Sequence, residues 1–67
     1  MSRETIKDRS QRTLGYIVTE NGGRQKALDA ARRTLGYYYP QQDVTKDAGQ
    51  RTIAHGNVLA SLIYEAD

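Results

Sequence analysis

The chain has 67 residues and a mass of 7.5 kDa, which allows one small domain, because a chain this short buries only roughly 60% of its unfolded surface. It contains no cysteine and one histidine, which excludes a disulfide framework and most zinc geometries. No apolar run approaches the roughly 20 residues of a membrane helix, and no signal peptide is recognisable. We therefore expect a soluble, cytoplasmic protein that spans no membrane and binds no cofactor.

The net charge of +2 is concentrated at the start of the chain. Residues 1–12 carry four basic and two acidic side chains, whereas residues 13–67 carry six of each. On charge alone, a mixed solvated surface is favoured over a nucleic-acid footprint. Since Ile6 is the only internal large apolar residue of the first segment, we expect residues 1–11 to form a mobile polar tail and residues 12–67 to form the domain.

An internal repeat is the most informative feature of the sequence. The pentapeptide Arg-Thr-Leu-Gly-Tyr occurs at residues 12–16 and again at 33–37, and a weaker copy, Arg-Thr-Ile-Ala-His, follows at 51–55. The second and third copies share the unit Asp-Ala-x-x-Arg-Thr, at a spacing of 18 residues. Such self-similarity indicates one supersecondary unit that is used more than once.

The repeat favours strands in a segment whose composition favours a helix. Residues 24–35 are rich in Ala, Leu, Lys and Arg, whereas their counterpart at 44–53 contains Val44, Thr45 and Gly49 and is typical of a strand, turn and strand. If both copies adopt one conformation, residues 29–32 form a turn. A short helix over 25–33 is the alternative.

The elements in chain order then define an α+β fold, a small antiparallel meander with one C-terminal helix. The five predicted strands cover about residues 12–19, 24–29, 33–39, 43–47 and 51–55, with short turn-like connections. The spacing of Val58, Leu59, Leu62 and Ile63 predicts a helix over about 58–65, and Asn57 is a suitable N-cap for it.

Strand alternation assigns the side chains to two faces of the sheet. We expect the helix to cover the face of Leu14, Tyr16 and Val18, which the second copy continues with Leu35, Tyr37 and Tyr39. The opposite face is then free to bind a partner, and a second copy of the chain packing there would form a homodimer. The candidate interface residues on it are Gly15, Ile17, Gly36, Tyr38 and Ala54. In the alternative interpretation, the glycines only permit the sheet to twist.

Two functions are compatible with such a face. Tyrosine and arginine are enriched at protein interfaces, so we expect a non-catalytic binding or regulatory module that acts through protein contact. The alternative is a single-stranded nucleic-acid-binding protein, in which Tyr38 stacks on bases while Arg12, Arg33 and Arg51 form a row that meets phosphates. We expect no enzyme, because the single histidine, His55, lies at a strand end with no catalytic partner at a supporting spacing.

One stretch of the chain resembles a pattern in small uncharacterised bacterial proteins that plasmids or prophages often encode. It comprises Leu-Gly-Tyr-Tyr-Tyr-Pro at 35–40, Asp-Val-Thr-Lys-Asp-Ala-Gly at 43–49 and Gly-Asn-Val-Leu at 56–59. The pattern's common form has aspartate at the position of Tyr39 and Gly-Arg in place of Gly-Gln-Arg. The resemblance implies a β-rich accessory protein of a mobile element, and it implies no activity and no site residues.

Overall fold

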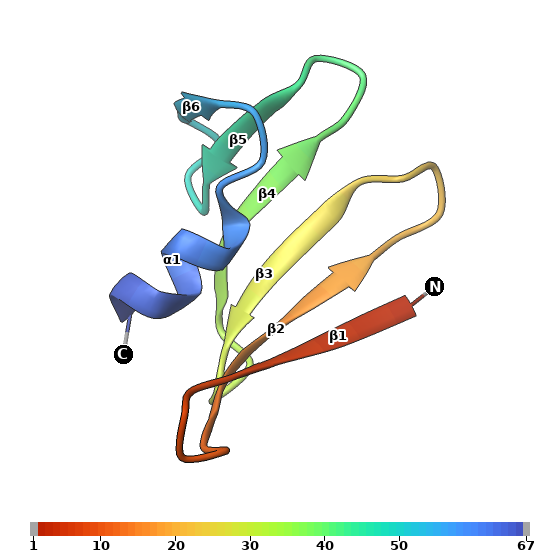
Figure 1. Ribbon diagram of the computed structural model, residues 1–67. Helices are drawn as coiled ribbons and strands as arrows, with labels where there is room; N and C mark the ends of the chain where they lie inside the picture. The colour runs from red at the N-terminus through yellow and green to blue at the C-terminus, as the bar shows by residue number, and fades with distance from the viewer. Residues whose placement is uncertain (1, 67) are drawn as a thin grey trace.

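The computed structural model describes residues 2–66, which form one antiparallel sheet followed by a helix (Figure 1). The elements are β1 (Ser2–Lys7), β2 (Thr13–Thr19), β3 (Gln25–Asp29), β4 (Thr34–Tyr39), β5 (Val44–Asp47), β6 (Thr52–His55) and α1 (Leu59–Ala66). The strands are hydrogen-bonded in their order along the chain. The predicted α+β meander with one C-terminal helix is confirmed, with six described strands where five were expected.

The segment of ambiguous propensity forms strand β3, a turn and strand β4. In that turn the Asp29 N–H donates to the Arg33 carbonyl at 3.0 Å, and the Arg32 N–H donates to the Asp29 carbonyl at 2.9 Å. The Asp29 carboxylate also accepts the Arg33 N–H at 2.8 Å. These local bonds compete with helix formation, so the strands are adopted and the helical alternative is not.

The expected mobile tail is corrected by the structure. Residues 2–7 form β1, which pairs with β2 from Ser2 opposite Thr19 to Lys7 opposite Thr13. An edge strand tolerates such a polar sequence, because one of its sides and one of its faces meet water. Met1 and Asp67, the outer ends of the expected tail and domain, lie outside the described residues.

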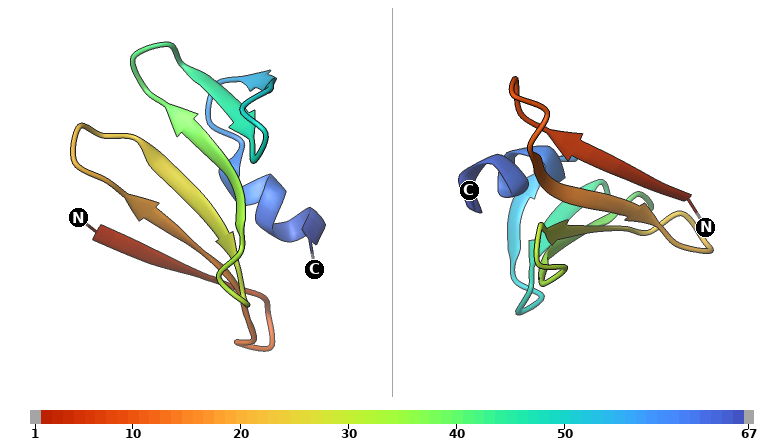
Figure 2. Two further views of the ribbon diagram at one scale, coloured as in Figure 1. Left: turned by 180° about the vertical axis from the view of Figure 1, so that it is seen from behind. Right: turned by 90° about the horizontal axis from the view of Figure 1, so that it is seen from below.

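The helix lies on one face of the sheet (Figure 2). Leu14 and Leu35 pack in the core with it as expected, but the rest of the covered face is that of Gly15 and Gly36 and not that of the tyrosines. A Cβ atom built on Gly15 would lie 2.9 Å from Cγ2 of Ile63, and one on Gly36 would lie 2.7 Å from Cδ1 of Leu62. Both glycines therefore lie directly beneath α1. Alternation separates two faces without specifying which one the helix takes, and here the close approach requires the face with the smaller residues.

Each repeat also carries an extra residue that interrupts the strand register. The pairing shifts opposite Leu14, Leu35 and Ile53, the third residue of each copy. Leu14 joins the buried core with Ala27, Leu59 and Ile63, and Leu35 packs against that core. The repeated unit is thus a hairpin whose second strand begins with a β-bulge. Helix α1 lies against β2, β3 and β4, and Ile53 on β6 remains 45% exposed.

The start of α1 is held by two side chains. The Asn57 side-chain oxygen accepts the Leu59 N–H at 3.1 Å, as the N-cap prediction requires. Fully buried Thr45 donates its hydroxyl to the Gly56 carbonyl at 2.6 Å and accepts the Val58 N–H at 3.2 Å. The sheet therefore fixes the position at which the helix begins.

Candidate binding surface on the open sheet face

The three predicted arginines lie at equivalent positions after three equivalent turns. Arg12, Arg33 and Arg51 precede β2, β4 and β6, and the Nε of each lies 3.2, 2.8 and 3.2 Å from the carboxylate of the aspartate four residues earlier. Each aspartate also accepts the backbone N–H of its arginine. The three predicted arginines therefore act as turn braces, each holding the aspartate of its own turn.

The turn aspartates are held ionised by these contacts. The pKa values of Asp8, Asp29 and Asp47 lie below the ordinary range, chiefly because backbone N–H groups bond to the charged carboxylates, and the arginines add to the effect. Asp8 was missed as the first member of this set. Its Asp-x-x-x-Arg spacing to Arg12 matches the other two copies and was a usable signal.

The face opposite α1 carries mostly basic and tyrosine side chains. Because directly opposed residues of paired strands share a face, one row crosses all six strands. The row consists of Arg3, Val18, Lys26, Tyr37, Lys46 and Thr52. Within residues 2–66, no helix or loop covers this side of the sheet, as the rear and lower views show (Figure 2). We call this side the open face.

Cations lie over the tyrosine rings of the open face. The guanidinium carbon of Arg3 lies 5.2 Å from the centroid of Tyr16, and that of Arg24 lies 5.1 Å from the centroid of Tyr37. The Lys46 ammonium lies 5.2 Å from the centroid of Tyr39. Contacts of this kind are worth about 0.5–1 kcal/mol at exposed sites, so they hold the side chains in place but can be exchanged for a ligand.

The helix side of the sheet carries carboxylates that are largely paired. Glu4, Asp29 and Asp47 lie opposite Ile17, Gly15 and Gly36, which places them on that side. Asp29 and Asp47 are bound there by the arginines of their turns.

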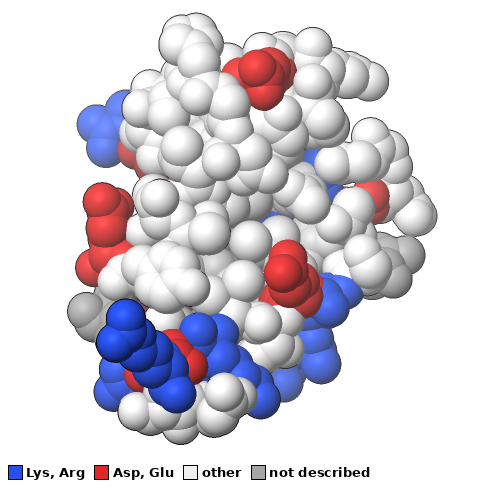
Figure 3. All heavy atoms as spheres, viewed as in Figure 1, with Lys and Arg blue, Asp and Glu red and all other residues white. Residues whose placement is uncertain are grey.

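Figure 3 views that side, where Lys and Arg gather mainly at the lower end. On the open face, the Glu20 carboxylate is bound by Arg24, whose hydrogen bond lowers the Glu20 pKa. The open face is therefore predominantly cationic.

The residues of the predicted interface lie on the helix side. Gly15 and Gly36 are covered by α1, Ile17 and Tyr38 pack against the core, and Ala54 shares their face through its pairing with Thr45. The chain's own helix therefore packs on this face. The prediction that a second copy of the chain packs there is wrong. The expected close approach is real, and the helix makes it together with the neighbouring strands, whose Leu28 and Lys46 carbonyl oxygens would lie 2.2 and 2.6 Å from a Cβ on Gly15 and on Gly36.

The tyrosines lie on the opposite faces of the sheet from those predicted for them. Tyr38, the predicted base-stacking residue, donates its hydroxyl to the Asp43 carboxylate at 2.7 Å, which raises the Tyr38 pKa. It lies on the opposite side of the sheet from the cation row. Tyr16, Tyr37 and Tyr39, which were expected in the core, stand on the open face, and the Tyr37 and Tyr39 ring centroids are 6.3 Å apart. The structure thus brings together a tyrosine and cation cluster that the sequence interpretation had divided.

Residues 2–66 contain no cluster of three or more His, Cys, Asp or Glu side chains that could hold a metal ion. None of their helices has the length and apolar character needed to cross a membrane. Comparison of the chain with family models, curated proteins and solved structures finds no match in any of the three.

Proposed function

We propose that the open face binds single-stranded nucleic acid. The observation that carries the proposal is the placement of Tyr16, Tyr37 and Tyr39 among Arg3, Lys26 and Lys46 on one uncovered antiparallel sheet. Tyrosine rings on a sheet stack with unpaired bases, and the cations beside them meet the phosphates.

The positive charge of the open face supports this choice of ligand. A predominantly cationic face attracts a polyanion and orients it. The rings favour single strands over a duplex, because stacked and paired bases do not present their faces to a side chain. Since the cations already lie over the rings, binding requires only that they move from ring to phosphate as a base takes their place.

A titration with a fluorescein-labelled oligonucleotide of about 12 nucleotides, within the roughly 4–16 that one small fold covers, tests the proposal at low salt. Two double variants remove the same charge at different places. Lys26→Gln with Lys46→Gln acts on the open face, whereas Arg33→Gln with Arg51→Gln acts on the turn braces. For the first, the slope of log affinity against log salt should flatten by about 1.4, or 0.7 per lost phosphate contact.

The turn-brace variant should retain the wild-type slope. Equal effects of the two double variants would show that net charge, and not the open face, governs binding. Replacement of Tyr37 by Leu should weaken binding by about 1–3 kcal/mol while leaving the salt slope unchanged, because stacking contributes no charge.

A second candidate function is protein contact through the edge strand β6. In the described sheet β6 pairs with β5 alone, so its outer backbone groups are open to an added strand. Ile53 on this strand is 45% exposed. A second copy of the chain is the simplest partner. Sedimentation of the wild type should then show a dimer that Ile53→Glu dissociates, and a monomer at high micromolar concentration would contradict this candidate.

A further inference from the structure

Two arginines converge on one tyrosine ring of the open face. The guanidinium carbon of Arg3, on β1, lies 5.2 Å from the centroid of the Tyr16 ring. That of Arg32, in the turn between β3 and β4, lies 5.8 Å from the same centroid. Both arginines are exposed, and Tyr16 on β2 is half-buried. Because β2 lies between β1 and β3 in the sheet, the two guanidiniums reach the ring from elements on either side of it.

No carboxylate of the described residues neutralises these two arginines. Four other arginines each bind a carboxylate four residues earlier in the chain: Arg12, Arg24, Arg33 and Arg51. Within residues 2–66, the side chains of Arg3 and Arg32 form neither an ion pair nor a hydrogen bond. Two positive charges therefore lie near one ring without a counter-charge, and such a site attracts an anion.

The geometry of its turn does not explain why residue 32 is an arginine. Arg32 has a φ of 69°, and Gln11 and Gln50 have φ values of 67° and 68° at the equivalent position of the other two turns. This left-handed conformation is unfavourable for any residue with a Cβ, and glutamine is accepted in it twice. The turn therefore does not require a guanidinium, and the contribution of Arg32 lies in the side chain that reaches the Tyr16 ring.

We propose that Arg3, Tyr16 and Arg32 form the anchoring subsite of the open face, in which one base of a single strand stacks on Tyr16 and the two guanidiniums hold the adjacent phosphate. The inference rests on the proposed function and names the residues of the strongest contact. A guanidinium binds phosphate oxygens through two parallel hydrogen bonds, so it suits this role better than an ammonium does. The incoming base displaces a guanidinium from the ring, and the phosphate beside that base binds it.

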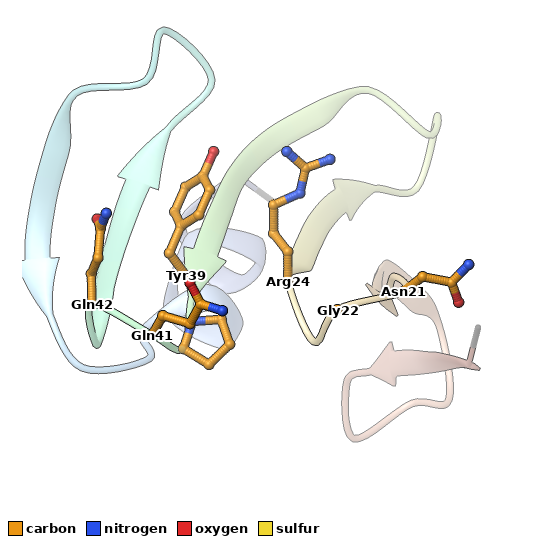
Figure 4. A pocket seen from close by; sticks show the side chains of 7 residues that line it. Asn21, Gly22, Arg24, Tyr39, Gln41 and Gln42 are labelled. Carbon is orange, nitrogen blue, oxygen red and sulfur yellow. The ribbon is translucent and has the colours of Figure 1, made fainter.

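The ring and cation at the other end of the open face are already engaged. Arg24 and Tyr39 lie side by side at a hollow between the β2–β3 and β4–β5 loops (Figure 4). The Glu20 carboxylate binds Arg24, and the Tyr39 hydroxyl donates to the side-chain oxygen of Gln50 at 2.7 Å. A ligand must compete with these partners, so we expect this end to contribute less to binding than the Tyr16 subsite.

Arg32→Gln tests the subsite, because it removes the guanidinium and introduces the residue that the other two turns carry at this position. The affinity for a labelled single strand of about 12 nucleotides should fall about tenfold or more, as expected for a lost hydrogen bond to a charged group. The slope of log affinity against log salt should flatten by about 0.7, for one phosphate contact. Arg32→Lys should keep the wild-type slope and lose part of the affinity, because it retains the charge without the planar fork.

Arg9→Gln is the matched control. It removes an exposed arginine from the equivalent turn between β1 and β2, and no tyrosine ring of the described residues lies beneath Arg9. This variant should keep the wild-type salt slope. Arg3→Gln acts on the same subsite from a different element and should flatten the slope as Arg32→Gln does, so the test does not depend on one turn.

A second pair of probes, the same strand with and without a 5′-phosphate, distinguishes a terminal from an internal phosphate. Tighter binding of the phosphorylated strand that Arg32→Gln abolishes would support the subsite with a terminal phosphate in it. Equal binding of the two strands, with both weakened by Arg32→Gln, would support the subsite with an internal phosphate.

The outcomes separate this inference from the function on which it rests. If Arg3→Gln and Arg32→Gln both bind as Arg9→Gln does, the subsite is contradicted. The open face would still stand as the binding surface if the variant with Lys26→Gln and Lys46→Gln showed its flattened slope. If the wild type does not bind the strand at all, both proposals are contradicted.

Discussion

The two faces of the sheet differ in residue size and in whether the helix covers them. The helix side carries small residues where the helix approaches, including Gly15, Gly36 and fully buried Ala27, and it is sealed by Leu59 and Ile63. The open face carries the large amphipathic residues, with tyrosine rings against the sheet and cations above them. The repeated glycine therefore marks close packing against the neighbouring strand and the chain's own helix, and the proposed binding surface lies on the other side.

The largest expected loss of stability follows from truncation of the helix where it seals the sheet. Ile63 is fully buried, so Ile63→Ala should lower the free energy of unfolding by about 2–5 kcal/mol through lost burial and a cavity. The next residue, Tyr64, is 55% exposed, and Tyr64→Ala should change stability by about 0.5 kcal/mol or less. Urea denaturation compares the two, and similar losses would contradict the assignment of the sealed face.

The close approach at Gly15 gives the next effect. A Cβ there would lie 2.2 Å from the Leu28 carbonyl oxygen and 2.9 Å from Ile63, so Gly15→Ala must displace backbone and should cost about 3 kcal/mol. Gly49→Ala is the control, because its Cβ would meet only the Asp47 carboxylate, at 3.4 Å. Equal thermal midpoints for the two variants would contradict the close approach of the Leu28 carbonyl and of Ile63 to Gly15.

A smaller loss is expected where Thr45 joins the sheet to the start of the helix. Thr45→Val removes a hydroxyl that serves both the Gly56 carbonyl and the Val58 N–H, and it should cost about 1–2 kcal/mol. Thr52→Val, on the exposed edge strand, should be nearly neutral. Amide exchange of Val58 should accelerate in the first variant only, and unchanged exchange would contradict the role of Thr45.

The mildest expected effect is a dependence of stability on acid. Because the folded-state pKa values of Asp8, Asp29 and Asp47 lie below their unfolded value of about 3.9, their contribution is complete above that pH and is lost as the pH falls through the folded values. Urea denaturation at several pH values measures it. The triple Asp→Asn variant should lose stability less steeply in acid, and an unchanged pH profile would contradict the role of the turn carboxylates.

The fold could be predicted because the repeat carried information beyond local propensity. The alanine-rich segment around Ala30 reads as helix in isolation, and the sister copy with Gly49 identified its turn. Strand β1 was missed because an edge strand needs little apolar material and Ile6 alone did not reveal it.

The residue types of the candidate site could be predicted from the sequence, but its face of the sheet could not. Tyrosine and basic residues were predicted to form the site. Alternation defines two faces, and no feature of the sequence indicates which one the helix covers. The face was decided by the geometric demand for Gly15 and Gly36 beneath α1, a constraint that appears only when the helix is docked. The choice of face in turn decided which tyrosines are free.

The most direct measurement follows the ring resonances of all five tyrosines by NMR during titration with an unlabelled single-stranded oligonucleotide. Stacking on the open face predicts large shifts for Tyr16, Tyr37 and Tyr39 and unchanged signals for Tyr38 and Tyr64, which lie on the helix side and on α1. Shifts confined to Tyr38 or Tyr64, or no shift at saturating ligand, would contradict the assignment of the open face as the binding surface.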